Sequence, residues 1–202
     1  MFYDPMISKL CTWAPTRTEA VAGMARALED FHIEGLGHNV PFLAAVMDQE
    51  RFVSGKLATS YIKDEFPDGF LGTEPTAFQQ DLLTAVGCAM QRIAARRLGS
   101  ARADWTVVVG HAKRPVRLSG EGRSLTVELL DEARCLTLTD IAWRPGLPTF
   151  RGVLDGRAFT VEVAPAPEGF VIRHRAAKAR VLVLTARSAE LHDKLPAKAP
   201  AD

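Results

Sequence analysis

Few residues of this sequence stand at a spacing that catalytic or binding chemistry requires. Gly55-Lys56 is the one Gly-Lys pair, and it lacks the GxxxxGK spacing that cradles phosphates on backbone amides. His38 precedes Asn39 at an expected helix start, without a metal-binding pattern around it. We therefore interpret His38 as a residue that hydrogen-bonds at the helix entry.

The three cysteines do not form a metal-binding or disulfide pattern. Cys11, Cys88 and Cys135 are odd in number, far apart in the sequence and surrounded by apolar residues. A disulfide framework or a CxxC metal site has paired or closely spaced cysteines. We expect three buried thiols.

Composition and charge exclude several classes of protein. The 202 residues are 47% hydrophobic with a net charge of +1, which is typical of one or two small globular domains. No stretch approaches the roughly 18 to 20 apolar residues of a membrane span, and the N-terminus lacks the pattern of a secretory signal. Residues 71–202 hold nineteen Lys/Arg against fourteen Asp/Glu, but no nucleic-acid-binding motif accompanies them. We expect neither a membrane nor a nucleic acid as partner.

The elements that must position any site change in type near residue 70. Before it, residues 3–11 have the pattern of a short strand, and Thr16 with Glu19 forms a capping box that predicts a helix start. Further helices are expected after Asn39 and over residues 59–65. The predicted order is strand, helix, strand, helix, helix.

A long apolar helix is predicted after the Pro/Gly-rich residues 66–75. It spans residues 76–98, and residues 82–90 (LLTAVGCAM) carry no charge. Because a helix that is apolar on nearly all sides requires burial on nearly all sides, we expect protein to enclose it, with Leu82, Leu83, Val86 and Met90 among the most buried side chains.

About eight short alternating segments follow over residues 105–187. Leu125, Val127 and Leu129 share one face of such a segment, and Asp155-Gly156 is a type I′ hairpin signal. If eight antiparallel strands close around the helix, they bury its apolar sides and leave no strand edge unpaired. The sequence therefore predicts an α+β fold: a mixed first part, then an antiparallel β-barrel of about eight strands around a long central helix.

Three motifs carry a resemblance to a known family. The stretches YDPMISKL at residues 3–10, EGLGHN at 34–39 and FPDGF at 66–70 resemble the α subunits of propionyl-CoA carboxylases, which are biotin-dependent carboxylases. The resemblance covers the whole chain. It implies that residues 1–65 are the C-terminal end of a biotin carboxylase domain, 66–75 a linker, 76–187 the domain that joins this enzyme to its carboxyltransferase, and 188–202 a linker toward an absent biotin carrier domain.

The resemblance also implies an enzyme and its cofactors. The complete enzyme is a ligase that uses ATP, Mg and biotin to carboxylate propionyl-CoA to methylmalonyl-CoA, in the cytoplasm or, in eukaryotes, the mitochondrial matrix. The AMKM segment that carries biotin is not among these 202 residues. We therefore expect that the fragment alone has no catalytic, cofactor-binding or metal-binding residues and is inactive.

The implied partners are the carboxyltransferase β subunit and the other α-subunit domains. In the family a loop at the exit of the central helix contacts the β subunit, which makes Arg102, Asp104 and Trp105 interface candidates; Trp105 can equally start the first strand with its ring inward. Asp4 corresponds to a position at the edge of the carboxylase active site or its dimer contact, although it can equally shape a strand end before Pro5.

Two alternatives remain open at this point. The chain can be the same segment of an acetyl-CoA or methylcrotonyl-CoA carboxylase, or it can be a free-standing barrel that binds a small ligand. The second alternative requires an empty cavity, which a helix inside the barrel excludes.

Overall fold

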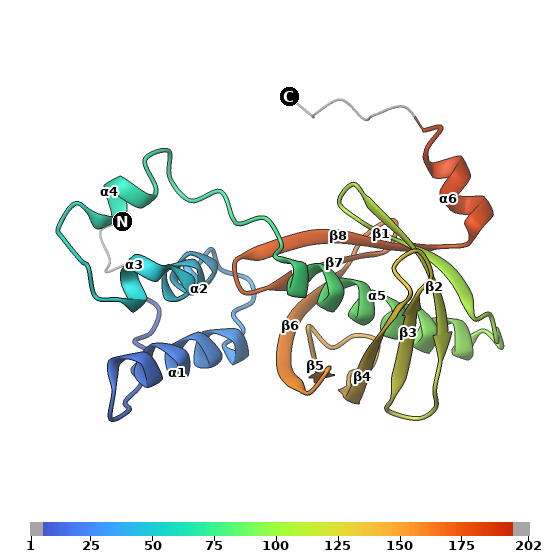
Figure 1. The fold of residues 1–202 in the computed structure, drawn as a ribbon, viewed down its shortest axis with the longest axis horizontal. Coiled ribbons are helices and arrows are strands. Elements are labelled where there is room, and N and C mark those ends of the chain that lie inside the picture. Colours follow the sequence, from blue (N-terminus) through green and yellow to red (C-terminus); the bar gives the residue numbers. More distant parts are fainter. Residues whose placement is uncertain (1–5, 196–202) are drawn as a thin grey trace. The chain divides into compact units, whose positions relative to one another are not determined.

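The computed structural model describes residues 6–195, which divide into two compact units, residues 6–73 and 74–195. The first unit contains four helices: α1 (Arg17–Asp30), α2 (Val40–Asp48), α3 (Glu50–Val53) and α4 (Tyr61–Glu65). The second unit contains α5 (Ala77–Arg97), eight strands and α6 (Ala186–His192). Figure 1 shows each unit by its colour along the chain.

The first unit forms as the capping residues predict, except for its strands. Thr16 and Glu19 make the expected capping box at the start of α1. Val21 and Leu28 of the apolar stripe are buried, so the stripe finds cover against the neighbouring helices of its own unit. Within residues 6–73 there is no strand element, so the strand expected over residues 3–11 is wrong for its described part. The strand expected between the first two helices is absent as well, so residues 6–11 have no strand among the described residues of this unit to pair with.

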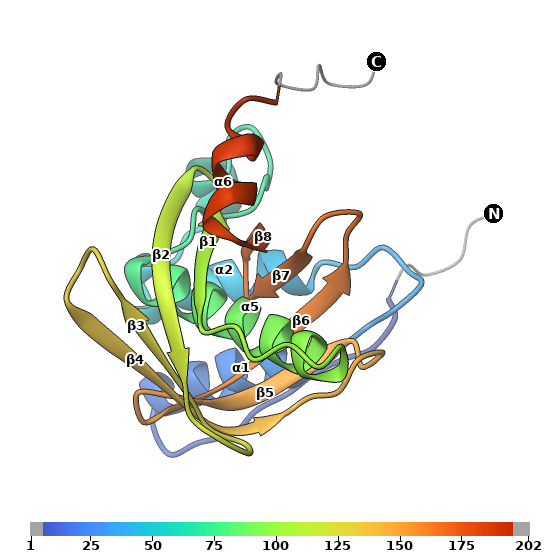
Figure 2. The same ribbon diagram turned by 90° about the vertical axis from the view of Figure 1, so that its right-hand side faces the viewer.

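The second unit is a closed barrel of eight antiparallel strands in sequence order, which β1 and β8 close. Figure 2 shows these strands around α5. The strands are β1 (Asp104–Val109), β2 (Ala112–Ser119), β3 (Leu125–Leu129), β4 (Arg134–Ala142), β5 (Thr149–Leu154), β6 (Arg157–Pro165), β7 (Phe170–His174) and β8 (Ala177–Leu184).

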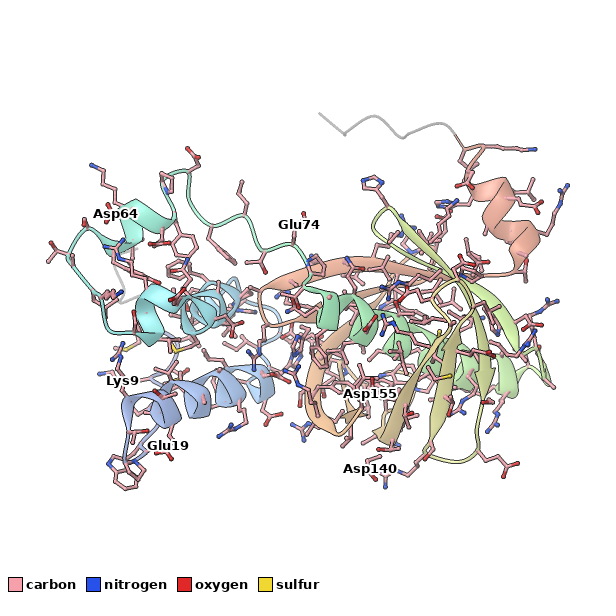
Figure 3. The ribbon with its side chains drawn as sticks, in the orientation of Figure 1. Lys9, Glu19, Asp64, Glu74, Asp140 and Asp155 are labelled. Carbon is pink, nitrogen blue, oxygen red and sulfur yellow. The ribbon has the colours of Figure 1, made fainter. Side chains whose placement is uncertain are left out.

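Turn residues set where strands reverse. Asp155 and Gly156 both have positive φ, 47° and 81°, in the two-residue connection of β5 to β6. This is the backbone of the type I′ hairpin that the sequence predicted, because its twist matches that of the strands. Figure 3 labels Asp155 at this turn and Asp140 at an irregularity of β4, where the register with β5 shifts.

The middle of α5 is enclosed on every side. Every residue from Leu82 to Met90 is buried, as the uncharged stretch predicted. Inward-facing residues of the strands, such as Leu125, Val127 and Leu129, pack into one core with them. At Gly87 an added Cβ would lie 2.6 Å from Cγ1 of Val181, so only glycine allows β8 to come this close.

A charged cluster holds the first half of α5 to the strands around it. Asp81 accepts two hydrogen bonds of 2.8 Å from Arg134 and one of 2.8 Å from Arg114. Burial opposes ionisation of Asp81, but the hydrogen bonds from Arg134 and Arg114 outweigh it and lower the pKa of Asp81 below 3.8. The Asp81 carboxylate is therefore ionised in the folded protein at neutral pH.

We predict that Val86→Asp unfolds the barrel unit. Val86 is fully buried, and an unpaired buried carboxylate costs several kcal/mol, of the order of a domain's whole stability. Thermal melts followed by circular dichroism measure this. Leu98→Asp is the control, because Leu98 is 86% exposed and the same change should cost less than about 1 kcal/mol. A Val86→Asp variant with the wild-type melting temperature would contradict the enclosed helix.

We predict that Asp81→Asn lowers the free energy of unfolding by about 2 kcal/mol at pH 7, since it removes the carboxylate that Arg114 and Arg134 share and leaves Glu132 as their remaining charged partner. Because the native pKa of Asp81 is lowered, its contribution is complete above the ordinary value of 3.8 and is lost as pH falls through the native value. Urea midpoints of wild type and variant should approach each other as pH falls below about 3.8 and meet once Asp81 is protonated in the native state. Asp131→Asn, at an exposed turn carboxylate, is the control.

Candidate partner interface

The exit of α5 is built by a glycine-terminated helix end. Leu98 is the C-cap residue, and Gly99 follows with φ 73°. The amide of Gly99 donates to the carbonyl of Arg96 at 3.0 Å, and the amide of Ser100 donates to the carbonyl of Ala95 at 2.9 Å. These two bonds define a Schellman motif, which fixes the direction in which the chain leaves the helix.

The structure brings Arg102, Asp104 and Trp105 together just beyond this exit. The indole nitrogen of Trp105 donates to the carbonyl of Arg102 at 3.2 Å, and the guanidinium of Arg102 lies 5.8 Å from the centre of the indole ring. Trp105 is 9% exposed and belongs to the barrel core, whereas Arg102 is exposed. Asp104 accepts from Arg117 of β2 at 2.8 Å. Trp105 thus supports the loop from inside, and Arg102 presents a charge at its surface.

Three further arginines lie at the same end of α5, and the sequence analysis did not single them out as a site. The guanidiniums of Arg92 and Arg96 both donate to the carbonyl of Gly120, at 3.2 and 3.4 Å. Arg97 is exposed in the last turn. The signal was present in the sequence: residues 82–103 contain four arginines and no carboxylate.

The other residues considered in the sequence analysis do not belong to this end of the helix. The imidazole of His38 accepts a hydrogen bond from the amide of Val40 at 3.3 Å, which is the helix-entry role expected of it. Arg173 and Arg180 pair with Glu162 and Glu168, so these basic strand residues belong to ion pairs. Asp4 lies outside the described residues. Lys9, labelled in Figure 3, is exposed.

The cysteines correct one expectation. Cys88 is fully buried on α5, and burial raises the pKa of its thiol far above the ordinary value. Cys11 and Cys135 are exposed, so the prediction of three buried thiols is wrong for two of them. Cys135 precedes the inward-facing Leu136 on β4, and alternation along the strand turns its side chain outward.

Neither a metal cluster nor a membrane helix is found in the part of the chain that the structure describes. Residues 6–195 contain no group of three or more His, Cys, Asp or Glu side chains that could hold a metal ion. No helix among them is long and apolar enough to cross a membrane. The first unit has a groove of about 790 Å³, lined largely by apolar side chains including Met24, Leu28 and Met47.

Comparison with known proteins assigns both units. Residues 1–64 match the biotin carboxylase C-terminal domain, and residues 83–198 match the propionyl-coenzyme A carboxylase BT domain. The whole chain is 38% identical to a propionyl-CoA carboxylase α chain of Ruegeria pomeroyi, covering 31% of that relative, and 30% identical to the mitochondrial propionyl-CoA carboxylase α chain of Mus musculus, covering 30%. Biotin carboxylase 1 of Bacillus subtilis is 44% identical over 62 residues, which are 31% of this chain and 14% of that relative.

The chain is thus of the class in which the end of a biotin carboxylase domain is followed by a BT domain, here a helix-filled antiparallel barrel. The chain belongs to the family of propionyl-CoA carboxylase α chains. The chain aligns over its whole length with these two α chains, but it spans only about a third of their length.

We predict that two of the three thiols react in the native protein. Exposed Cys11 and Cys135 should be labelled rapidly by Ellman's reagent at pH 8, because they have access to solvent. Cys88 should react only after unfolding in guanidinium, since it is buried with a raised pKa. Absorbance of the released thiolate counts the reacted groups, and Cys135→Ser should remove one of them. Rapid reaction of all three thiols would contradict the closed barrel.

Proposed function

We propose that this chain is a non-catalytic assembly segment that joins the biotin carboxylase of an α subunit to the carboxyltransferase β subunit of a propionyl-CoA carboxylase. One observation carries this proposal: the two units match, in this order, the end of a biotin carboxylase and the BT domain. The complete enzyme would convert propionyl-CoA to methylmalonyl-CoA with ATP, Mg and biotin. No described residue is assigned to any of these groups.

The interior of the barrel supports an assembly role over ligand binding. Helix α5 occupies the space in which an eight-stranded barrel otherwise holds a small molecule. What the barrel unit presents to a partner is therefore its outer surface and the loops at its two ends. Of the segments around α5, residues 99–105 leave the helix along a fixed path and carry an exposed arginine.

The proposal assigns a role to each part of the chain. Residues 1–65 serve as the end of the biotin carboxylase domain, residues 66–75 as a linker, residues 76–187 as the joining domain and residues 188–202 as a linker toward a carrier domain. Helix α6 (Ala186–His192) crosses the start of this last region and packs against β1 and β8, with Ala189 buried. Asp4 remains a candidate for the edge of the carboxylase active site or its dimer contact.

We predict that the purified chain binds the purified carboxyltransferase β subunit of the same organism, and that Arg102→Ala weakens this binding about thirtyfold. Truncating an anchoring arginine commonly costs about 2 kcal/mol. Biolayer interferometry measures the affinity, and circular dichroism checks that the fold is intact. Lys56→Ala, at an exposed loop of the first unit, is the control and should bind like wild type. Wild-type chain that shows no binding would overturn the proposal.

A further inference from the structure

The end of α5 carries a surface that differs from the rest of the barrel unit. We define the arginine patch as Arg92, Arg96, Arg97 and Arg102, together with Leu98 between them. We propose that the arginine patch docks onto an acidic surface of a protein partner, whose carboxylates face the guanidiniums and whose apolar depression receives Leu98. This inference rests on the proposed docking function and deepens it, because it names the chemistry of the surface that binds.

The first argument is charge without partners. On the strands, Arg114, Arg117, Arg134, Arg173 and Arg180 each form an ion pair with a carboxylate. Within residues 6–195, none of the four patch arginines has such a pair. The neighbouring β2–β3 loop does not neutralise them, since it holds Glu121 and Arg123 in equal number. The patch therefore keeps its positive charge in the folded chain.

The second argument is that the fold holds the positive charges of Arg92 and Arg96 close together, which is electrostatically unfavourable. Arg92 and Arg96 converge on one acceptor, the carbonyl of Gly120. Burial and the positive charge of Arg96 lower the pKa of Arg92. A carboxylate that arrives between the two guanidiniums would replace repulsion by charge-assisted hydrogen bonds.

Favourable interaction with the helix dipole does not explain the whole patch. Cations in the last turn of a helix interact favourably with the helix dipole, and this accounts for Arg96 and Arg97. Arg102, however, lies four residues beyond the C-cap, outside the range of the dipole. Its guanidinium rests over the ring of Trp105, which holds it at the surface.

The third argument is an exposed apolar centre on a rigid support. Leu98 is 86% exposed, although it caps a helix whose apolar middle, Leu82 to Met90, is enclosed. The Schellman hydrogen bonds of Gly99 and Ser100 fix its position before any partner arrives. An apolar anchor among arginines, on a preorganised backbone, is the composition of a protein-binding hot spot.

The test uses the whole chain and the purified carboxyltransferase β subunit of the same organism, with association and dissociation rates measured at 50 and 300 mM NaCl. The association rate constant of wild type should fall at least about tenfold between these salt concentrations, because salt screens steering by exposed charges. Arg97→Glu should slow association about tenfold at 50 mM NaCl, and the difference should shrink at 300 mM. Leu98→Ala should raise the dissociation rate about fivefold at both salt concentrations.

The control carries the same charge change elsewhere on the barrel. Lys178→Glu reverses an exposed charge on β8 and should alter the association rate less than twofold. If wild type binds but Arg97→Glu and Lys178→Glu behave alike, the arginine patch is overturned while the docking function stands. If wild type does not bind the β subunit, both are overturned.

A polyanion arm separates protein docking from general anion binding. A 20-nucleotide oligo(dT) should bind the chain much more weakly than the β subunit does, because it offers phosphates without an apolar depression for Leu98. If oligo(dT) binds as tightly, and Leu98→Ala leaves the dissociation rate from the β subunit unchanged, the patch is a nucleic-acid or general polyanion surface and the proposal is wrong.

Discussion

The second unit depends on the need to remove the middle of α5 from water on all sides. A helix with a single apolar stripe packs against one layer, but the residues from Leu82 to Met90 leave no polar side to expose. The strands have the complementary need, since eight short antiparallel strands with one apolar face must cover that face and pair their edges. Closure around the helix meets both needs, and Gly87 shows how closely the two are fitted.

Because the interior is filled, charged residues gather at the ends of the helix, and the two ends differ. Near its start, Asp81 joins Arg114 and Arg134 in a cluster whose charges are satisfied within the fold. At its end, Arg92 and Arg96 share a backbone carbonyl and meet no carboxylate among the described residues. The first arrangement holds the helix in the barrel. The second leaves charge for an interaction outside it.

The elements of this fold could be predicted from the sequence because each has a local cause. Thr16 with Glu19 begins α1, the uncharged residues 82–90 require enclosure, and Asp155-Gly156 reverses a hairpin. A local sequence pattern does not show which other element will pack or pair with a segment. The strand-like run expected over residues 3–11 forms no strand in its described part, where residues 6–73 contain no second strand to pair with it. The apolar surroundings of Cys135 suggested burial, although alternation with Leu136 turns it outward.

The candidate interface residues also show that a local sequence pattern does not determine which side chains are buried. The sequence analysis treated Trp105 and Arg102 alike, as candidates for the partner interface. In the structure Trp105 is buried in the core, where its indole supports the loop, whereas Arg102 is exposed with its guanidinium over the indole ring. The stability of the barrel requires the first residue and gains little from the second, since an exposed arginine without a carboxylate partner contributes little to folding. The exposed Arg96, Arg97 and Arg102, with the partly buried Arg92 and the exposed Leu98 in the same stretch, follow a helix end that two backbone hydrogen bonds make rigid. This surface is therefore better explained by binding than by folding.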